Sequence, residues 1–441
     1  MPRRVHIVTF GCQMNKLDSE LVASALLAAG HEVVARPEEA DAVLLNTCSV
    51  RDQAENRALS AVGVLKLRKE REPGFLIGVL GCMAQRRGKE LVRRYPAIDL
   101  VVGTRLFPRI AELLEAAAQS PVAAVEENPR EPLPARRPAA GPQAFVAAMR
   151  GCGNFCAYCI VPFVRGPEES RPLAEIVEEV RALVAGGARE VTLLGQSIDR
   201  WGQDLAPRRM LEELLAAVDG VPGLLRLRFI TAHPRAVDRD LFRAMAALPR
   251  VCECLHMPAQ SGSDRVLQAM NRGYTRAEYE ERLAWGRALV PGLTFASDFL
   301  VGFPGETEAE FLETLDLVER GAFQNIFAFR YSPRPGTAAA KRKDDVPPEE
   351  KERRLQALLR AQERIALIRH ASLRGTIQTV LVEGPSKRDA SRMAGRTRQN
   401  DPAMFPAPSS ESERASLVGR EIALRITRST ALTLFGERAE E

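Results

Sequence analysis

The chain has 441 residues, of which 45% are hydrophobic and 27% are charged, and its formal net charge is +5. At about 150 residues per domain, this length predicts two or three domains, and the composition is ordinary for a soluble protein. No uninterrupted apolar run approaches the roughly 18 residues that span a membrane, and the N-terminus does not resemble a signal peptide. Eight cysteines in so long a chain do not form a secreted disulfide framework, so we expect a cytoplasmic protein without membrane contact.

The first segment, residues 1–118, alternates strand and helix patterns. Strands are predicted at 5–10, 42–46 and 75–80, and helices at about 18–29 and 53–70. This alternation predicts a parallel sheet covered by helices.

Three cysteines of this segment each follow the end of a predicted strand: Cys12, Cys48 and Cys82. Because the ends of parallel strands share one edge of a sheet, these thiols can meet in space. Three thiolates would hold a four-iron, four-sulfur cluster and leave one iron open. The alternative is three unrelated buried cysteines.

A proline-rich stretch at 119–143 shows no sustained periodicity, and we expect it to be an extended linker. Directly after it, Cys152, Cys156 and Cys159 follow a short apolar run with C-x3-C-x2-C spacing. Zinc sites normally use four ligands, and no fourth Cys or His lies nearby. This loop therefore also favours a cluster with one open iron, at which chemistry can take place.

The middle segment, residues 144–368, repeats a strand followed by a helix six times. Strands are predicted at 145–149, 191–194, 225–230, 252–256, 294–301 and 326–331, and helices at 173–185, 210–218, 237–246, 276–289 and 306–319. Six such units predict a partial (β/α) barrel, whose chemistry lies in the loops after the strands. Cys252 and Cys254 alternate within a strand, and we interpret them as core residues.

The last segment, residues 369–437, follows a long polar helix predicted from Pro348 to about His370. Strands predicted at 376–382 and 421–427 indicate a small β-barrel. Between Arg374 and Asn400, six basic residues stand against two acidic ones. This excess favours a nucleic-acid partner over a merely solvated surface, with Lys387, Arg388, Arg392, Arg396 and Arg398 as the candidate contacts.

The cysteine loop resembles that of the radical S-adenosylmethionine (SAM) enzymes, and the likeness extends to one of their families. Gly11-Cys12-Gln13-Met14-Asn15, Asn46-Thr47-Cys48, Gly81-Cys82-Met83-Ala84-Gln85 and Met270-Asn271-Arg272-Gly273-Tyr274 are similar to segments of the methylthiotransferases. The tail resembles a TRAM domain. Ser197 departs from the family pattern, which has asparagine after Gln196.

The resemblance implies two [4Fe-4S] clusters, one on each cysteine group, and SAM bound at the barrel cluster. It implies cofactor contacts by Tyr158, Gln196, Gln260, Asp298, Gly302 and Glu306, with no catalytic residue beyond the cluster ligands. The implied partners are a tRNA anticodon stem-loop, an electron donor such as flavodoxin or ferredoxin, and a source of sulfur, and we expect a monomer.

The implied reaction adds a methylthio group to carbon 2 of N6-isopentenyladenosine at position 37 of tRNA. Two alternatives keep the chemistry and change the target to threonylcarbamoyladenosine of tRNA or to a ribosomal-protein aspartate. A third is an iron–sulfur RNA-binding protein without enzymatic activity.

Overall fold

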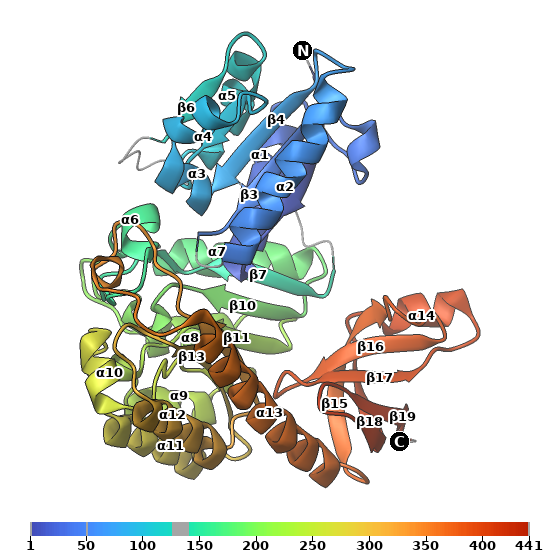
Figure 1. Cartoon of the computed structure of the whole chain (residues 1–441). Coiled ribbons are helices and arrows are strands. Elements are labelled where there is room, and N and C mark those ends of the chain that lie inside the picture. The colour runs from blue at the N-terminus through green and yellow to red at the C-terminus, as the bar shows by residue number, and fades with distance from the viewer. Residues whose placement is uncertain (1, 50–51, 126–140, 440–441) are drawn as a thin grey trace. The chain divides into compact units, whose positions relative to one another are not determined.

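The computed structural model describes residues 2–49, 52–125 and 141–439. They form two compact units. The first contains the described residues up to 125 together with 150–153 and 159–168, and the second contains 141–149, 154–158 and 169–439. Figure 1 shows the elements of both.

The first unit is a six-stranded parallel sheet with the order β2-β1-β3-β4-β5-β6. Its strands are β1 (Arg4–Thr9), β2 (Glu32–Val33), β3 (Ala42–Thr47), β4 (Leu76–Gly81), β5 (Leu100–Val102) and β6 (Val122–Ala124). Every residue of β3 and β4 is buried, as expected for central strands covered on both faces. The predicted parallel sheet is confirmed.

Separate apolar clusters form on the two faces of this sheet. The helices of the unit are α1 (Gln13–Ala28), α2 (Asp52–Lys69), α3 (Cys82–Arg87), α4 (Lys89–Arg94), α5 (Ile110–Ala117) and α6 (Val161–Arg165). One departure from the sequence prediction is β6, which pairs with β5 inside the stretch expected to be linker. It has only three residues, too few for a periodic pattern, and residues 126–140 of that stretch lie outside the described chain.

The second unit contains six parallel strands followed by helices, as predicted. The strands are β7 (Gln143–Ala147), β10 (Glu190–Leu194), β11 (Arg226–Ile230), β12 (Cys254–His256), β13 (Thr294–Val301) and β14 (Asn325–Arg330). They form two three-stranded sheets, β11-β10-β7 and β12-β13-β14, which a bridge between Leu227 and Val251 connects. The result is an open partial barrel.

The covering helices are α7 (Leu173–Ala185), α8 (Leu211–Asp219), α9 (Arg239–Ala247), α10 (Asp264–Ala269), α11 (Arg276–Leu289), α12 (Glu308–Gly321) and α13 (Pro348–Ser372). Helix α11 begins at the predicted residue because Thr275 and Glu278 form a capping box. Thr307 and Glu310 form another, which starts α12 at Glu308, two residues after the predicted start. Cys252 is buried and Cys254 is partly buried, with its Sγ 3.4 Å from Gln324 Oε1, in agreement with a core role.

The predicted small β-barrel is closed, with the order β15-β16-β17-β19-β18. Its strands are β15 (Ile377–Pro385), β16 (Arg392–Thr397), β17 (Pro402–Pro406), β18 (Glu421–Ser429) and β19 (Leu434–Arg438), and α14 (Glu411–Leu417) lies between β17 and β18. No helix in the described part of the chain is long and apolar enough to cross a membrane.

Asp401 joins the small barrel to α13 and to the larger barrel. Its carboxylate, 4% exposed, accepts two hydrogen bonds from Arg369 at 2.7 Å and one from Gln324 at 2.8 Å. Burial by itself would raise the pKa of Asp401, but hydrogen bonds from His370 and Arg369 keep this pKa well below its usual range. The carboxylate is therefore charged wherever the protein is folded near neutral pH.

Replacing this carboxylate should weaken the second unit. We expect Asp401→Ala to lower the free energy of unfolding by about 3 kcal/mol, because Arg369 would keep its charge and lose its partner. Denaturant unfolding followed by circular dichroism measures this change. Asp389→Ala is the control, since its carboxylate is exposed and its loss should leave the free energy of unfolding nearly unchanged. Equal losses in the two variants would contradict the role of Asp401.

Candidate cofactor sites

The first unit brings Cys12 and Cys48 into contact at the carboxyl edge of its sheet. Cys12 precedes α1 and Cys48 follows β3, and a hydrogen bond between the two side chains lowers the pKa of Cys12 to about 6. Gly11 makes this approach possible: a Cβ on it would lie 2.6 Å from the Cys48 Cβ, and its φ is +136°. Cys82 begins α3 at the end of the neighbouring β4.

Two buried asparagines fix the loops that carry these cysteines. Asn15 Oδ1 accepts hydrogen bonds from the backbone N–H and the Sγ of Cys12, both at 3.3 Å. Asn15 Nδ2 donates to Thr47 O at 3.1 Å, and Asn46 Nδ2 donates to Asn15 O at 2.8 Å. Both asparagines occur in the methylthiotransferase-like segments, but the sequence did not assign them a role. Their contacts show that they position thiols.

A buried ion pair lies beside this cysteine group. Arg165 of α6 donates two hydrogen bonds to Asp18 of α1, at 3.2 and 2.5 Å, and the two side chains are 5% and 3% exposed. Ile160 and Val164 pack against Cys82, and Thr104 Oγ1 donates to Val164 O at 2.9 Å. Burial raises the pKa of the Cys82 thiol, and the charge of Arg165 partly offsets that rise.

The donor set fits an iron–sulfur cluster better than a single ion. In the part of the chain that the structure describes, no three His, Cys, Asp or Glu side chains are close enough together to hold one metal ion. A cluster distributes its thiolates over several irons, and its ligands are cysteines. Three cysteines, one of them with a lowered pKa, and a nearby guanidinium match that requirement.

The C-x3-C-x2-C loop is held by backbone hydrogen bonds in both units. In the first unit, the N–H of Cys152 donates to Gly166 O at 3.1 Å. In the second unit, the N–H of Ala157 donates to Met270 O at 2.8 Å, and the N–H of Ala339 donates to Ala157 O at 2.7 Å. Asn271 Nδ2 donates to Phe155 O at 3.1 Å. These bonds fix the residues on either side of Cys156.

Arg272 donates from Nη1 to Cys156 Sγ at 3.3 Å. The sequence included this arginine in a family-like segment but gave it no function. Its partner in the cysteine loop lies 116 residues away in the chain, so spacing alone could not have found the contact.

The six predicted SAM contacts occupy different environments. Gln196 Oε1 is buried and has no hydrogen-bond partner among the described residues, so it is an acceptor available to a ligand. Tyr158 packs at the edge of an apolar cluster that includes Phe303 and Tyr331. The Asp298 carboxylate is 3.0 Å from His256 Nε2. Gln260, at φ +72°, exchanges backbone hydrogen bonds with β13.

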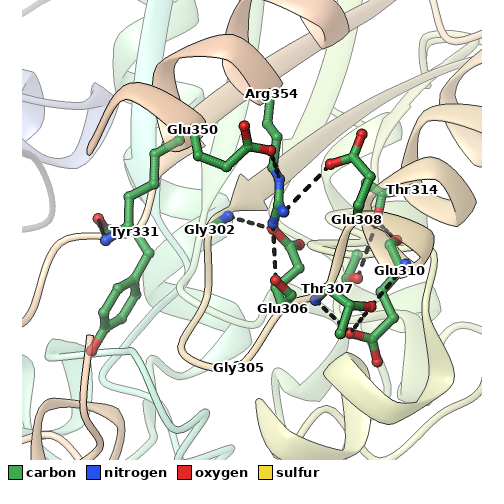
Figure 2. A network of polar contacts seen from close by, with 12 residues as sticks. Gly302, Gly305, Glu306, Thr307, Glu308, Glu310, Thr314, Tyr331, Glu350 and Arg354 are labelled. Carbon is green, nitrogen blue, oxygen red and sulfur yellow. Dashed lines mark hydrogen bonds and ion pairs between the residues drawn. The ribbon is translucent and has the colours of Figure 1, made fainter. Parts of the chain in front are cut away.

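Gly302 and Glu306 form a backbone turn, which Figure 2 shows together with Arg354. The N–H of Gly302 donates to Glu306 Oε2 at 2.6 Å, and Arg354 Nη1 donates to the same oxygen at 2.8 Å. The Glu306 side chain is 0% exposed, and its Oε2 supports this turn. Gly302 has φ +70°, and a Cβ there would lie 2.3 Å from Lys351 Cγ.

Three family models match the chain. "Uncharacterized protein family UPF0004" matches residues 4–103, "Radical SAM superfamily" matches 146–318, and "TRAM domain" matches 371–438. A tRNA-2-methylthio-N(6)-dimethylallyladenosine synthase of Moorella thermoacetica is 44% identical to the chain, with 98% of both proteins covered. The chain belongs to this synthase family.

Other relatives agree. The synthase of Carboxydothermus hydrogenoformans is 43% identical over 98% of both chains, and that of Geobacter metallireducens is 44% identical over 99% of this chain and 98% of its own. As a member of this family, the chain is a radical SAM transferase.

A solved structure supports the fold of this family member. The radical SAM methyltransferase TsrM of Kitasatospora setae, with cobalamin and a [4Fe-4S] cluster bound, has a TM-score of 0.56 at 16% identity, over 77% of this chain and 74% of its own. At that identity the likeness concerns the fold alone.

The barrel rim of this family member contains a buried polar network next to Gln196. Asn154 Nδ2 donates to Ser197 Oγ at 3.1 Å, and Ser197 Oγ lies 3.3 Å from both Asp199 oxygens. The N–H of His233 donates to Asp199 Oδ1 at 2.5 Å. Ser197, which departs from the family pattern, therefore connects the cysteine loop to Asp199.

The basic residues proposed for RNA contact divide into two groups. Lys387 and Arg388 are exposed. Three others have carboxylate partners: Arg392 with Asp389, Arg396 with Glu383, and Arg398 with Glu253 at 2.7 Å. Arg398 also donates to the carbonyls of Pro249 and Val251, so it connects the small barrel to the larger one. The sequence did not reveal these contacts of Arg398, because their partners lie about 145 residues away in the chain.

Asp199 should make the stability of the barrel depend on pH. Burial raises the pKa of Asp199 to about 7, well above the usual value of an aspartate, so the folded protein binds this proton more tightly than the unfolded chain. The free energy of unfolding should therefore fall as the pH rises from about 4 to 7 and stay low above that. Asp199→Asn should be more stable than the parent by about 1–3 kcal/mol at pH 8, with a smaller difference at pH 5.

Tryptophan fluorescence during denaturant unfolding measures this, because both tryptophans, Trp201 and Trp285, belong to the barrel. Asp199→Ala is the control and should destabilise at both pH values, since the His233 N–H loses its acceptor. A stability difference between Asp199→Asn and the parent that is the same at pH 5 and pH 8 would rule out the titration.

Proposed function

We propose that the chain adds a methylthio group to carbon 2 of N6-isopentenyladenosine at position 37 of tRNA. The observation that carries this proposal is the 44% identity to a synthase named for that product, over 98% of both chains. Two contacts of the cysteines add support, because the buried Arg272 donates a hydrogen bond to Cys156 and the charge of the buried Arg165 lies near Cys82.

Cys152, Cys156 and Cys159 would hold one [4Fe-4S] cluster, and Cys12, Cys48 and Cys82 would hold a second. Tyr158, Gln196, Gln260, Asp298 and Gly302 would surround SAM, with Glu306 supporting the turn at Gly302. Bound clusters and SAM supply one-electron chemistry, which the reaction needs because an aromatic C–H is not acidic enough for acid–base catalysis.

The side chains of this protein prepare the sites for that chemistry. Asn15 and Gly11 keep Cys12 next to Cys48, and the low pKa of Cys12 favours the thiolate that an iron requires. Gln196 Oε1 offers a hydrogen-bond acceptor inside the barrel mouth, where a bound amine or hydroxyl would satisfy it.

The small barrel is the proposed tRNA-binding part, and exposed Lys387 and Arg388 are its best-placed phosphate contacts. The target base has to leave its stack to reach a barrel, which an anticodon loop allows more easily than a duplex. The proposal includes an external electron donor such as flavodoxin or ferredoxin, a sulfur source, a monomeric state and a cytoplasmic location. The domain limits given from the sequence remain a prediction.

Anaerobic reconstitution with iron and sulfide tests the cofactor content. We expect about eight irons per chain and release of 5′-deoxyadenosine when SAM and dithionite are added. About four irons would contradict the two-cluster proposal. If no SAM is cleaved, the result would favour the alternative of an iron–sulfur RNA-binding protein without enzymatic activity.

Two cysteine variants separate the two proposed clusters. Cys156→Ala should abolish 5′-deoxyadenosine release, because the barrel cluster loses a ligand. Cys48→Ala should keep that release and lose methylthio insertion, since only the second cluster is affected. Mass spectrometry of the nucleosides detects the product, and methylthioadenosine made by Cys48→Ala would refute the assigned role.

Analysis of tRNA from a strain that lacks the gene identifies the substrate. Loss of 2-methylthio-N6-isopentenyladenosine from its tRNA is the expected result, and complementation with this chain should restore it. Loss of the threonylcarbamoyl derivative, or of a modified ribosomal aspartate, would point to one of the alternative substrates.

A further inference from the structure

Arg272 is a buried arginine that forms hydrogen bonds to groups other than carboxylates. The residue is 5% exposed, and its guanidinium donates to Cys156 Sγ at 3.3 Å, to Pro258 O at 2.7 Å and to the Tyr274 hydroxyl at 3.0 Å. Among the residues that the structure describes, no Asp or Glu forms an ion pair with it. The buried charge therefore faces a thiol, a carbonyl and a phenol.

Three other buried arginines of the chain do have acidic partners. Arg165 pairs with Asp18 at 2.5 Å, Arg226 with Glu421 at 2.6 Å and Arg354 with Glu306 at 2.8 Å. A buried charge without a counter-charge is unfavourable, because the protein interior screens and solvates it poorly. A neutral thiol at Cys156 would leave Arg272 uncompensated, whereas an anionic sulfur ligand would balance it.

The backbone around Arg272 is built to keep this contact. Asn271 and Gly273, on either side of it, have φ values of +58° and +69°, so the chain turns sharply at the arginine. Asn271 Nδ2 donates to Phe155 O, and Met270 O accepts from the Ala157 N–H. The segment therefore binds the residues immediately before and after Cys156. Tyr274, which accepts from Arg272, is fixed in turn by donating to Ala259 O at 2.6 Å.

We propose that Arg272 sets the reduction potential of the cluster held by Cys152, Cys156 and Cys159, through a charge-assisted hydrogen bond to the Cys156 sulfur. This inference rests on the proposed function, which places a [4Fe-4S] cluster there. Reduction adds one electron from an external one-electron donor and takes the cluster core from 2+ to 1+, with no bond made or broken in the protein. Positive charge and hydrogen bonds at the sulfur stabilise the more negative, reduced form and raise the potential.

Arg272 is thus a positioning residue that acts through Cys156. The guanidinium suits this task because it keeps its charge and directs several donors at once. One donor contacts the cluster ligand, and the others bind Pro258 and Tyr274, which prevents the side chain from turning away.

The test uses the full chain with Cys12, Cys48 and Cys82 replaced by alanine, so that the barrel cluster is the only one expected. This parent and its Arg272→Gln, Arg272→Lys and Arg276→Gln variants are reconstituted anaerobically. Each is titrated with dithionite while electron paramagnetic resonance follows the reduced cluster. Arg276 is the matched control, because it lies four residues further on and is paired with Glu280 and Asp316.

We expect the midpoint potential of Arg272→Gln to shift to more negative values, with about four irons per chain still bound. Arg272→Lys should shift less, since it keeps the charge and loses the fork of donors. Arg276→Gln should match the parent. SAM cleavage by Arg272→Gln should be slow with a weak reductant and recover with excess dithionite, which a folding defect would not allow.

An unchanged potential in Arg272→Gln would overturn the inference. If that variant binds no iron, Arg272→Lys decides: a potential equal to that of the parent overturns the inference, and a more negative one supports it. A parent that itself binds no cluster would instead refute the proposed function, so the two failures are distinguishable.

Discussion

A sulfur anion can be kept inside a protein only where hydrogen-bond donors or a positive charge lie next to it, and both cysteine groups of this chain meet that condition. In the first unit, Asn15 and the Arg165–Asp18 pair lie near Cys12 and Cys82. In the second, Arg272 contacts Cys156 directly. The two arginines differ in one respect: Arg165 already has a carboxylate, whereas Arg272 has none among the described residues. The two sulfur environments therefore differ in net charge although both use three cysteines.

The folds around these sulfurs follow from the direction of parallel strands. In each unit, loops at the carboxyl ends of neighbouring strands carry the polar residues, because all strands of a parallel sheet end at the same edge. Cys12 and Cys48 meet there in the first unit, and Ser197, Asp199 and His233 meet in the second. The surrounding hydrophobic clusters hold the strands, while glycines such as Gly11 and Gly302 let the loops approach closely.

The sequence predicted long periodic elements well and short ones poorly. Helices α7 and α11 and strand β13 begin and end at the predicted residues, since each has a regular apolar pattern and clear ends. Strand β6 and helix α6 have five residues or fewer, so tertiary pairing rather than local pattern determines them. The same limit applies to the site. The cysteines could be recognised by spacing, but the contacts of Arg272, Asn15 and Asp18 join residues 3 to 147 positions apart and depend on folding. Arg398 was proposed for RNA because charge counts do not reveal which arginines already have partners.

Helix α6 follows the last cysteine of the loop in sequence but packs in the first unit, and this makes that unit discontinuous along the chain. A fragment that ended before residue 141 would contain Cys12, Cys48 and Cys82 yet lack Ile160, Val164 and Arg165. Cys82 would lose its apolar cover, and Asp18 would be buried without a cation. A continuous N-terminal fragment of the chain therefore does not contain the whole first unit. Such a fragment would need new side chains in place of Ile160, Val164 and Arg165 to cover Cys82 and to pair with Asp18.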